Sequence, residues 1–288
     1  MLCLYGFDAA IRNIYSATYR SDRSGAVANM DQLRCCYLDF LGPSYASGAT
    51  RTAGGIVRDI ATENDLSAFF ISGDPGDQKQ QRVMGDAFPP TLRAEKIALA
   101  ATALERLLAL DEDLRALFEL VIHSIIVRPH SDSAVCLGGS NSDAIGLIWM
   151  SVPAQLGERD LAELFLHELT HHLLYIDEAS HAQFMYEDML APENFISSAI
   201  LKKAKSVCKV FHSMIVGVEI CTWRQRLGWG AGASVAHPCS LDLLAGVRGA
   251  HQALTALPRF DALTTPHARA ILADAMDQCG ALEASLGR

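Results

Sequence analysis

The 288-residue chain has few features of a nucleic-acid-binding or membrane protein. It carries 24 Lys and Arg against 33 Asp and Glu, a net charge of −9, and has no basic stripe of the kind that binds a duplex. Its densest basic cluster, Lys202, Lys203, Lys205 and Lys209, is typical of a solvated helix face. No apolar run approaches the roughly 18 residues that span a bilayer, and the first residues lack the basic segment of a signal peptide. We therefore expect neither a nucleic acid nor a membrane as partner.

The sequence also lacks the cysteine spacing of a disulfide framework. It has eight cysteines but no CxxC, and Cys35 and Cys36 are adjacent, which is a poor geometry for mutual pairing. This usage indicates free thiols and a cytoplasmic location. Half of the residues are hydrophobic, so the chain can bury a sizeable core.

The pattern along the chain predicts a mostly helical α+β protein. Residues 1–90 give only short helical patterns between Gly-rich and polar stretches, so we interpret them as an N-terminal subdomain or cap with a lid-like loop near 72–90. We expect residues 91–288 to form the metal-binding catalytic domain. Helices are expected at 26–41, 55–70, 91–110, 111–123, 160–177, 179–190, 195–227, 239–257 and 265–286, and two or three strands at 124–129, 134–140 and 145–153.

One motif carries chemical information. His167-Glu168-Leu169-Thr170-His171 is an HExxH sequence, and at this composition chance gives roughly 0.015 occurrences. On a helix, His167 and His171 leave the same face and can hold one divalent metal. Glu168 lies about 100° round the helix, within reach of a metal-bound water but badly placed as a third ligand. Asp160 is the expected N-cap of this helix.

Several residues could complete a metal site. A metzincin-type peptidase would need Gly at position 174, which is Leu, and His or Asp at position 177, which is Asp. A thermolysin-like peptidase needs a Glu about twenty residues beyond the second His, and Glu187 and Glu193 bracket that position. His181 is a further candidate for the third ligand, although it would need a turn of its own.

The long downstream helix offers further candidates. His212 and Glu219 are seven residues apart and share a helix face. A Glu within the apolar run MIVGVEIC needs a partner, which could be a metal, a cationic side chain or polar groups of the core.

The wider pattern resembles a known family. LGGSNSDAIGLIWMS precedes LAELFLHELTHHLL, and an SSAI…KK segment and VFHSMIVGVEICTWR follow it. This arrangement, over about residues 92–230, is similar to the 2-oxoglutarate-dependent HExxH-type peptide β-hydroxylases found beside ribosomally made peptides. The resemblance implies a mononuclear non-haem Fe(II) site with His167, His171 and, as best guess, His212 as ligands; Glu219 is the fallback.

The resemblance also implies roles for other residues. The distal carboxylate of 2-oxoglutarate usually needs a cationic partner, for which Arg224 ranks slightly above Arg128. Glu168 would orient a water or a ligand rather than act as a general base. The implied reaction is hydroxylation of a β-carbon in a ribosomally made peptide.

The alternative function is that of a zinc metallopeptidase. There Glu168 would be the general base on a zinc-bound water, Glu187 or Glu193 would be the third ligand, and the edge of the preceding sheet would pair with a peptide. Both functions predict a zincin-like core with a small β-sheet, an HExxH helix and a long second ligand helix.

Overall fold

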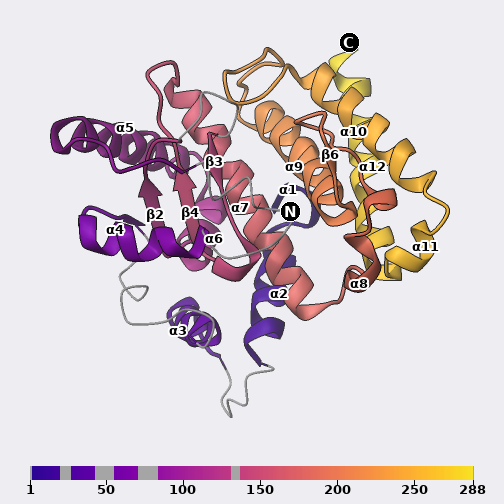
Figure 1. The fold of residues 1–288 in the computed structure, drawn as a ribbon, viewed down its shortest axis with the longest axis horizontal. Helices are drawn as coiled ribbons and strands as arrows, with labels where there is room; N and C mark the ends of the chain where they lie inside the picture. The colour runs from indigo at the N-terminus through magenta and orange to yellow at the C-terminus, as the bar shows by residue number, and fades with distance from the viewer. Residues whose placement is uncertain (1, 20–26, 43–54, 71–83, 131–136, 288) are drawn as a thin grey trace. The chain divides into compact units, whose positions relative to one another are not determined.

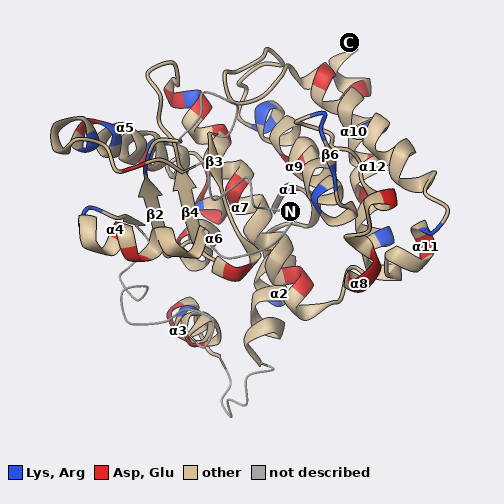
Figure 2. Ribbon diagram, viewed as in Figure 1, with Lys and Arg blue, Asp and Glu red and all other residues tan. Residues whose placement is uncertain are grey.

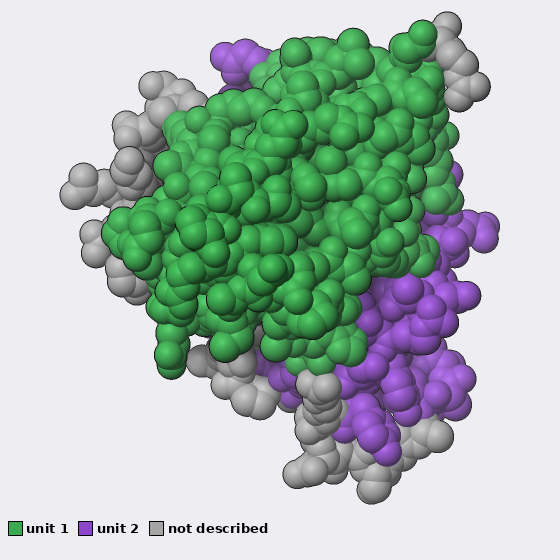
Figure 3. Space-filling model, turned by 90° about the vertical axis from the view of Figure 1, so that its right-hand side faces the viewer, with its two compact units in different colours: residues 1–6, 177–288 green, residues 7–176 purple. Residues whose placement is uncertain are grey.

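The computed structural model describes residues 2–19, 27–42, 55–70, 84–130 and 137–287. The chain forms two compact units: unit 1 comprises Met1–Gly6 and Asp177–Arg288, and unit 2 comprises Phe7–Ile176 (Figure 3). The fold is mostly helical with a small mixed sheet, as the sequence predicts (Figure 1). None of the helices in these ranges combines the length and apolar character that crossing a bilayer requires.

Unit 2 is built around a four-stranded sheet with the strand order β1-β2-β4-β3. The strands are β1 (Gly55–Ile56), β2 (Ser124–Val127), β4 (Leu147–Met150) and β3 (Gly138–Gly139). β1, β2 and β4 are parallel, whereas β3 is an antiparallel edge strand next to β4. β2 and β4 are fully buried and carry no charged residue (Figure 2), as strands covered on both faces require.

Helices surround this sheet. They are α2 (Phe7–Tyr19), α3 (Met30–Leu41), α4 (Ile60–Ser67), α5 (Pro90–Leu108), α6 (Glu112–Val121) and α7 (Glu158–Ser180), and the short 3-10 helices are η2 (Ala68–Phe70) and η5 (Ser142–Ala144). α4 and α5 both contact β2. Asn29, Asp59 and Asp111 cap three of the helices, each by accepting the backbone N–H of the residue three positions on.

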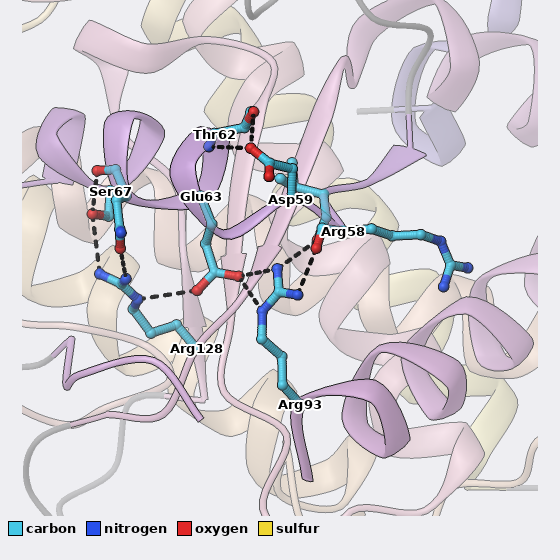
Figure 4. A network of polar contacts seen from close by, with 9 residues as sticks. Arg58, Asp59, Thr62, Glu63, Ser67, Arg93 and Arg128 are labelled. Carbon is cyan, nitrogen blue, oxygen red and sulfur yellow. Dashed lines mark hydrogen bonds and ion pairs between the residues drawn. The ribbon is translucent and has the colours of Figure 1, made fainter. Parts of the chain in front are cut away.

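Of the described residues before Pro90, those from Phe7 onward belong to unit 2, and those before it belong to unit 1. The Tyr37 hydroxyl donates to the Val121 carbonyl at 3.1 Å. The buried Glu63 carboxylate of α4 accepts from Arg93 of α5 and from Arg128 at the end of β2 (Figure 4). The two compact units divide the chain after Gly6 and, within α7, after Ile176, and the boundary expected at 90/91 stays a prediction. Residues 71–83 of the expected lid-like loop lie outside the described residues.

Unit 1 is a helical assembly around α9 (Val207–Arg226), 14 of whose 20 residues are buried. The other elements are α1 (Leu2–Tyr5), α8 (Tyr186–Met189), η6 (Pro192–Asn194), β5 (Ile196–Ser197), β6 (Ala204–Lys205), α10 (Ser240–Thr255), α11 (Phe260–Leu263) and α12 (Pro266–Leu286). α9 packs closely on α10, because a Cβ added at Gly217 would lie 3.0 Å from the Val247 side chain.

Two helix predictions in unit 1 are wrong. The segment 195–206 is not the start of a long helix but an antiparallel hairpin of β5 and β6, in which Lys202 adopts a left-handed φ of 53°. The segment 179–190 is helical only at its two ends, where α7 finishes and α8 begins. The end of α9 is as predicted, since Gly228 follows it with a φ of +65°.

Candidate metal centre

Helix α7 carries the HExxH motif and begins two residues earlier than predicted. Gly157 precedes the first turn, and the Asp160 carboxylate accepts the Gly157 N–H at 2.8 Å. Asp160 is therefore the third helical residue reaching back to the helix start, as in the returning half of a capping box, and not the N-cap itself. Residues 160–166 of the helix are buried, whereas His167 and His171 are partly exposed.

The two motif histidines face one another. The Nε2 atoms of His167 and His171 are 3.2 Å apart, and the ring centroids are 4.9 Å apart. Two imidazole nitrogens that bind one metal ion at about 2.1 Å lie about 3.0 to 3.4 Å apart. The pair therefore fits two positions of a single metal site.

Tyr175 extends this helix face by one further turn. Its ring stacks on His171 with the centroids 6.2 Å apart and the planes 16° from parallel. Sequence reasoning missed Tyr175, although the spacing 167, 171, 175 places it on the motif face. Its contact restricts the orientation of the His171 ring.

Glu168 points toward the sheet side of the helix and is 3% exposed. Burial raises the pKa of this carboxyl to about 8, and Ser140 opposes the shift only in part. Within the described residues, its Oε2 atom has no hydrogen-bond partner. A buried polar atom of this kind needs a water, an ion or a ligand to complete its bonding.

The edge strand β3 lies against Glu168. A Cβ added at Gly138 would be 3.3 Å from Glu168 Oε1 and 3.0 Å from the Trp149 carbonyl oxygen. Ser140 follows the strand, and its hydroxyl lies close enough to Glu168 to oppose the rise in the pKa of that carboxyl. The strand expected at 134–140 is thus present at Gly138–Gly139, and it places Gly138 and the following Ser140 beside Glu168 of the motif.

His172 fixes the opposite face of α7 to the sheet. Its Nδ1 accepts the Gly146 N–H at 3.1 Å, and it is fully buried. Gly146 has a φ of +89°, and a Cβ there would come within 2.4 Å of the His123 ring. This packing sets the rotation of α7 about its axis and so directs the His167–His171 face.

The expected third ligands all lie in unit 1, whereas the motif pair lies in unit 2. His212 is 6% exposed on α9, and burial, assisted by Lys209, lowers its pKa to about 3. Glu187 in α8 and Glu193 in η6 are exposed. No group of three or more His, Cys, Asp or Glu in the described ranges is arranged as a metal site.

Glu219 has a structural role within unit 1. Its two carboxylate oxygens accept the backbone N–H groups of Cys3 and Leu4, at 3.0 and 3.1 Å. These are orphan donors in the first turn of α1, where a carboxylate is favoured. The buried Glu therefore has the polar partners that its position in an apolar run requires.

The two arginines expected near 2-oxoglutarate are held by protein groups. Arg224 is 1% exposed and donates to the Pro238 carbonyl at 2.8 Å and the Ser240 hydroxyl at 3.3 Å. Arg128 donates to Glu63, Ser67 and Asn64 (Figure 4). Both contact sets stabilise the fold around them.

No protein-family model matches the chain, and no curated protein matches it significantly.

Proposed function

We propose that this chain is a metal-dependent enzyme that acts on a peptide, with His167 and His171 as two ligands of one divalent ion. The 3.2 Å separation of their Nε2 atoms carries this proposal. Two imidazoles on one face of a firmly packed helix are suited to borderline metals such as iron and zinc. The antiparallel strand β3 beside α7 supports the proposal of a zincin-like core.

The proposed reaction is Fe(II)/2-oxoglutarate-dependent hydroxylation of a β-carbon in a ribosomally made peptide. The resemblance of residues 92–230 to the HExxH-type peptide β-hydroxylases supports it. When bound, Fe(II) and 2-oxoglutarate supply the oxidation of an unactivated C–H bond by O₂. The chain would bind the metal through His167 and His171, restrain His171 by stacking Tyr175 on it, and place Glu168 and Ser140 beside the site.

His212 remains the proposed third ligand. Within unit 1 it is favoured over Glu219, because both oxygens of Glu219 already accept backbone N–H groups of α1. If Glu219 bound a metal instead, the backbone N–H groups of Cys3 and Leu4 would lose their hydrogen-bond acceptors.

A zinc metallopeptidase is the second candidate, and one observation favours it. Glu168 lies against the edge strand β3, with Oε1 3.3 Å from a Cβ position at Gly138. An extended peptide that added to this edge would bring its main chain near Glu168, which would act on a zinc-bound water.

An anaerobic titration separates the two candidates. Metal-free protein receives Fe(II) and then 2-oxoglutarate, while the visible spectrum is recorded. The oxygenase predicts a charge-transfer band that needs both additions, bleaches with O₂ and is absent in His167→Ala. A protein that shows no band, retains zinc tightly and cleaves peptides unless it carries Glu168→Gln would instead be a peptidase.

A further inference from the structure

A second histidine pair lies in unit 1, apart from the HExxH motif. His181 follows the end of α7, and His267 is in the first turn of α12. Their ring centroids are 4.7 Å apart with the planes tilted by 46°. This spacing is close to the 4.9 Å of the motif pair, and the tilt differs from parallel stacking.

A buried carboxylate orients this second pair. Asp177 is 2% exposed, and its Oδ2 atom accepts from His267 Nε2 at 2.8 Å and from Gln183 Nε2 at 2.6 Å. A His267 ring that donates a single proton from Nε2 to Asp177 has its lone pair on Nδ1. A carboxylate that holds one ring nitrogen while the other is available is the usual arrangement around a metal-bound histidine.

The backbone around the pair is held in place. Thr265 donates its N–H to the Gln183 carbonyl and its hydroxyl to the Ala182 carbonyl, at 2.9 and 2.8 Å. Phe184 and Thr264 form an isolated antiparallel bridge. His181 is exposed and the His267 side chain is 38% exposed, so a solvated ion can reach both rings.

We propose that His181 and His267 form a second site for a divalent transition metal, with zinc as the probe ion. Nδ1 of His267 and a ring nitrogen of His181 are the two protein ligands, Asp177 is the positioning residue, and water fills the other positions. Imidazole suits zinc, copper and nickel, and water ligands make the ion exchangeable. Bound metal links the end of α7 to the start of α12 within unit 1.

Zinc binding to the 288-residue chain, stripped of metal, tests the site. Bound zinc is measured by equilibrium dialysis at neutral pH and saturating free zinc, for wild type, His181→Ala, His267→Ala and the control His251→Ala on α10. We expect His181→Ala and His267→Ala each to bind one zinc ion fewer per chain, and His251→Ala to match wild type. Asp177→Asn keeps both ligands and should weaken this zinc by about 10- to 100-fold.

Zinc binding at the His181–His267 pair can be measured separately from zinc binding at the HExxH motif. His167→Ala would lose the zinc of the proposed catalytic centre and retain the second ion. Because His181 is exposed, its replacement should leave folding intact, which the circular dichroism spectrum checks. Unchanged zinc stoichiometry and affinity in folded His181→Ala would overturn the proposal, whatever the motif pair binds.

Discussion

Helices α7 and α9 both carry polar residues among apolar ones, but these polar residues have different partners in the two helices. In α7, the ring nitrogens of His167 and His171 face each other, and Glu168 Oε2 lacks a partner among the described residues. In α9, Glu219 and Arg224 bond to main-chain groups of neighbouring segments. Polar side chains that face one another indicate a bound ligand, whereas polar side chains that bond to the main chain indicate a structural role.

The largest loss of stability is expected when the buried hydrogen bonds of Glu219 on α9 are removed. Glu219→Ala removes the acceptor of two backbone N–H groups from a buried position, so the free energy of unfolding should fall by about 4 kcal/mol. His167→Ala is the matched change in α7. It should cost less than about 1 kcal/mol of stability, because His167 is partly exposed, yet abolish tight metal binding.

Chemical denaturation and metal titration of both variants check this comparison. Glu219→Gln retains an acceptor oxygen and should recover part of the lost stability. If Glu219→Ala folded normally but lost the metal, Glu219 would be a ligand and the comparison between the helices would fail.

A second prediction concerns the buried histidine behind α7. Burial, with a smaller contribution from Arg34, lowers the pKa of His123 from 6.5 to about 4, and its bond to the Ile145 carbonyl opposes the shift in part. Between these pH values the unfolded chain binds a proton that the folded chain excludes. Stability from this group is therefore complete above about pH 6.5 and declines as the pH falls toward 4, by about 3 kcal/mol.

His123→Gln should remove this contribution to the pH dependence. Urea unfolding measured from pH 7 to pH 4 would show a shallower decline for His123→Gln than for wild type. His251→Gln, at a less buried position, is the control and should change the slope less. Equal slopes for wild type and His123→Gln would show that His123 exchanges its proton as freely in the folded chain as in the unfolded one.

The sequence predicts α7 better than it predicts α9, for physical reasons. The apolar flanks and the four-residue histidine spacing are local signals, and they locate α7 to within three residues at each end. The hairpin before α9 depends on a distant contact: a Cβ at Gly246 of α10 would lie 2.3 Å from the Ala199 carbonyl oxygen. The apolar, helix-like periodicity of 195–206 carries no signal of that contact, so the sequence pattern alone predicts a helix there.

The strands and the site also divide into features that local sequence predicts and features that depend on distant contacts. β2 and β4 follow from their apolar runs, but β1 has two residues and is held by pairing with a strand about seventy positions away. The motif pair was predictable from spacing. The position of Ser140 beside Glu168 was not, because it depends on the register of β3 against β4.

The smallest expected effect tests the contact between β3 and Glu168. At Gly138 a Cβ would lie 3.0 Å from the Trp149 carbonyl oxygen and 3.3 Å from Glu168, whereas at Gly139 the nearest atom, in the Trp149 ring, is 3.4 Å away. Gly138→Ala should therefore cost about 1 to 2 kcal/mol and displace the carboxyl, and Gly139→Ala should be nearly neutral. Because neither change touches His167 or His171, both variants should bind metal as wild type does. Reduced turnover in Gly138→Ala alone would place Glu168 in the reaction, and equal turnover in the two variants would restrict β3 to a structural role.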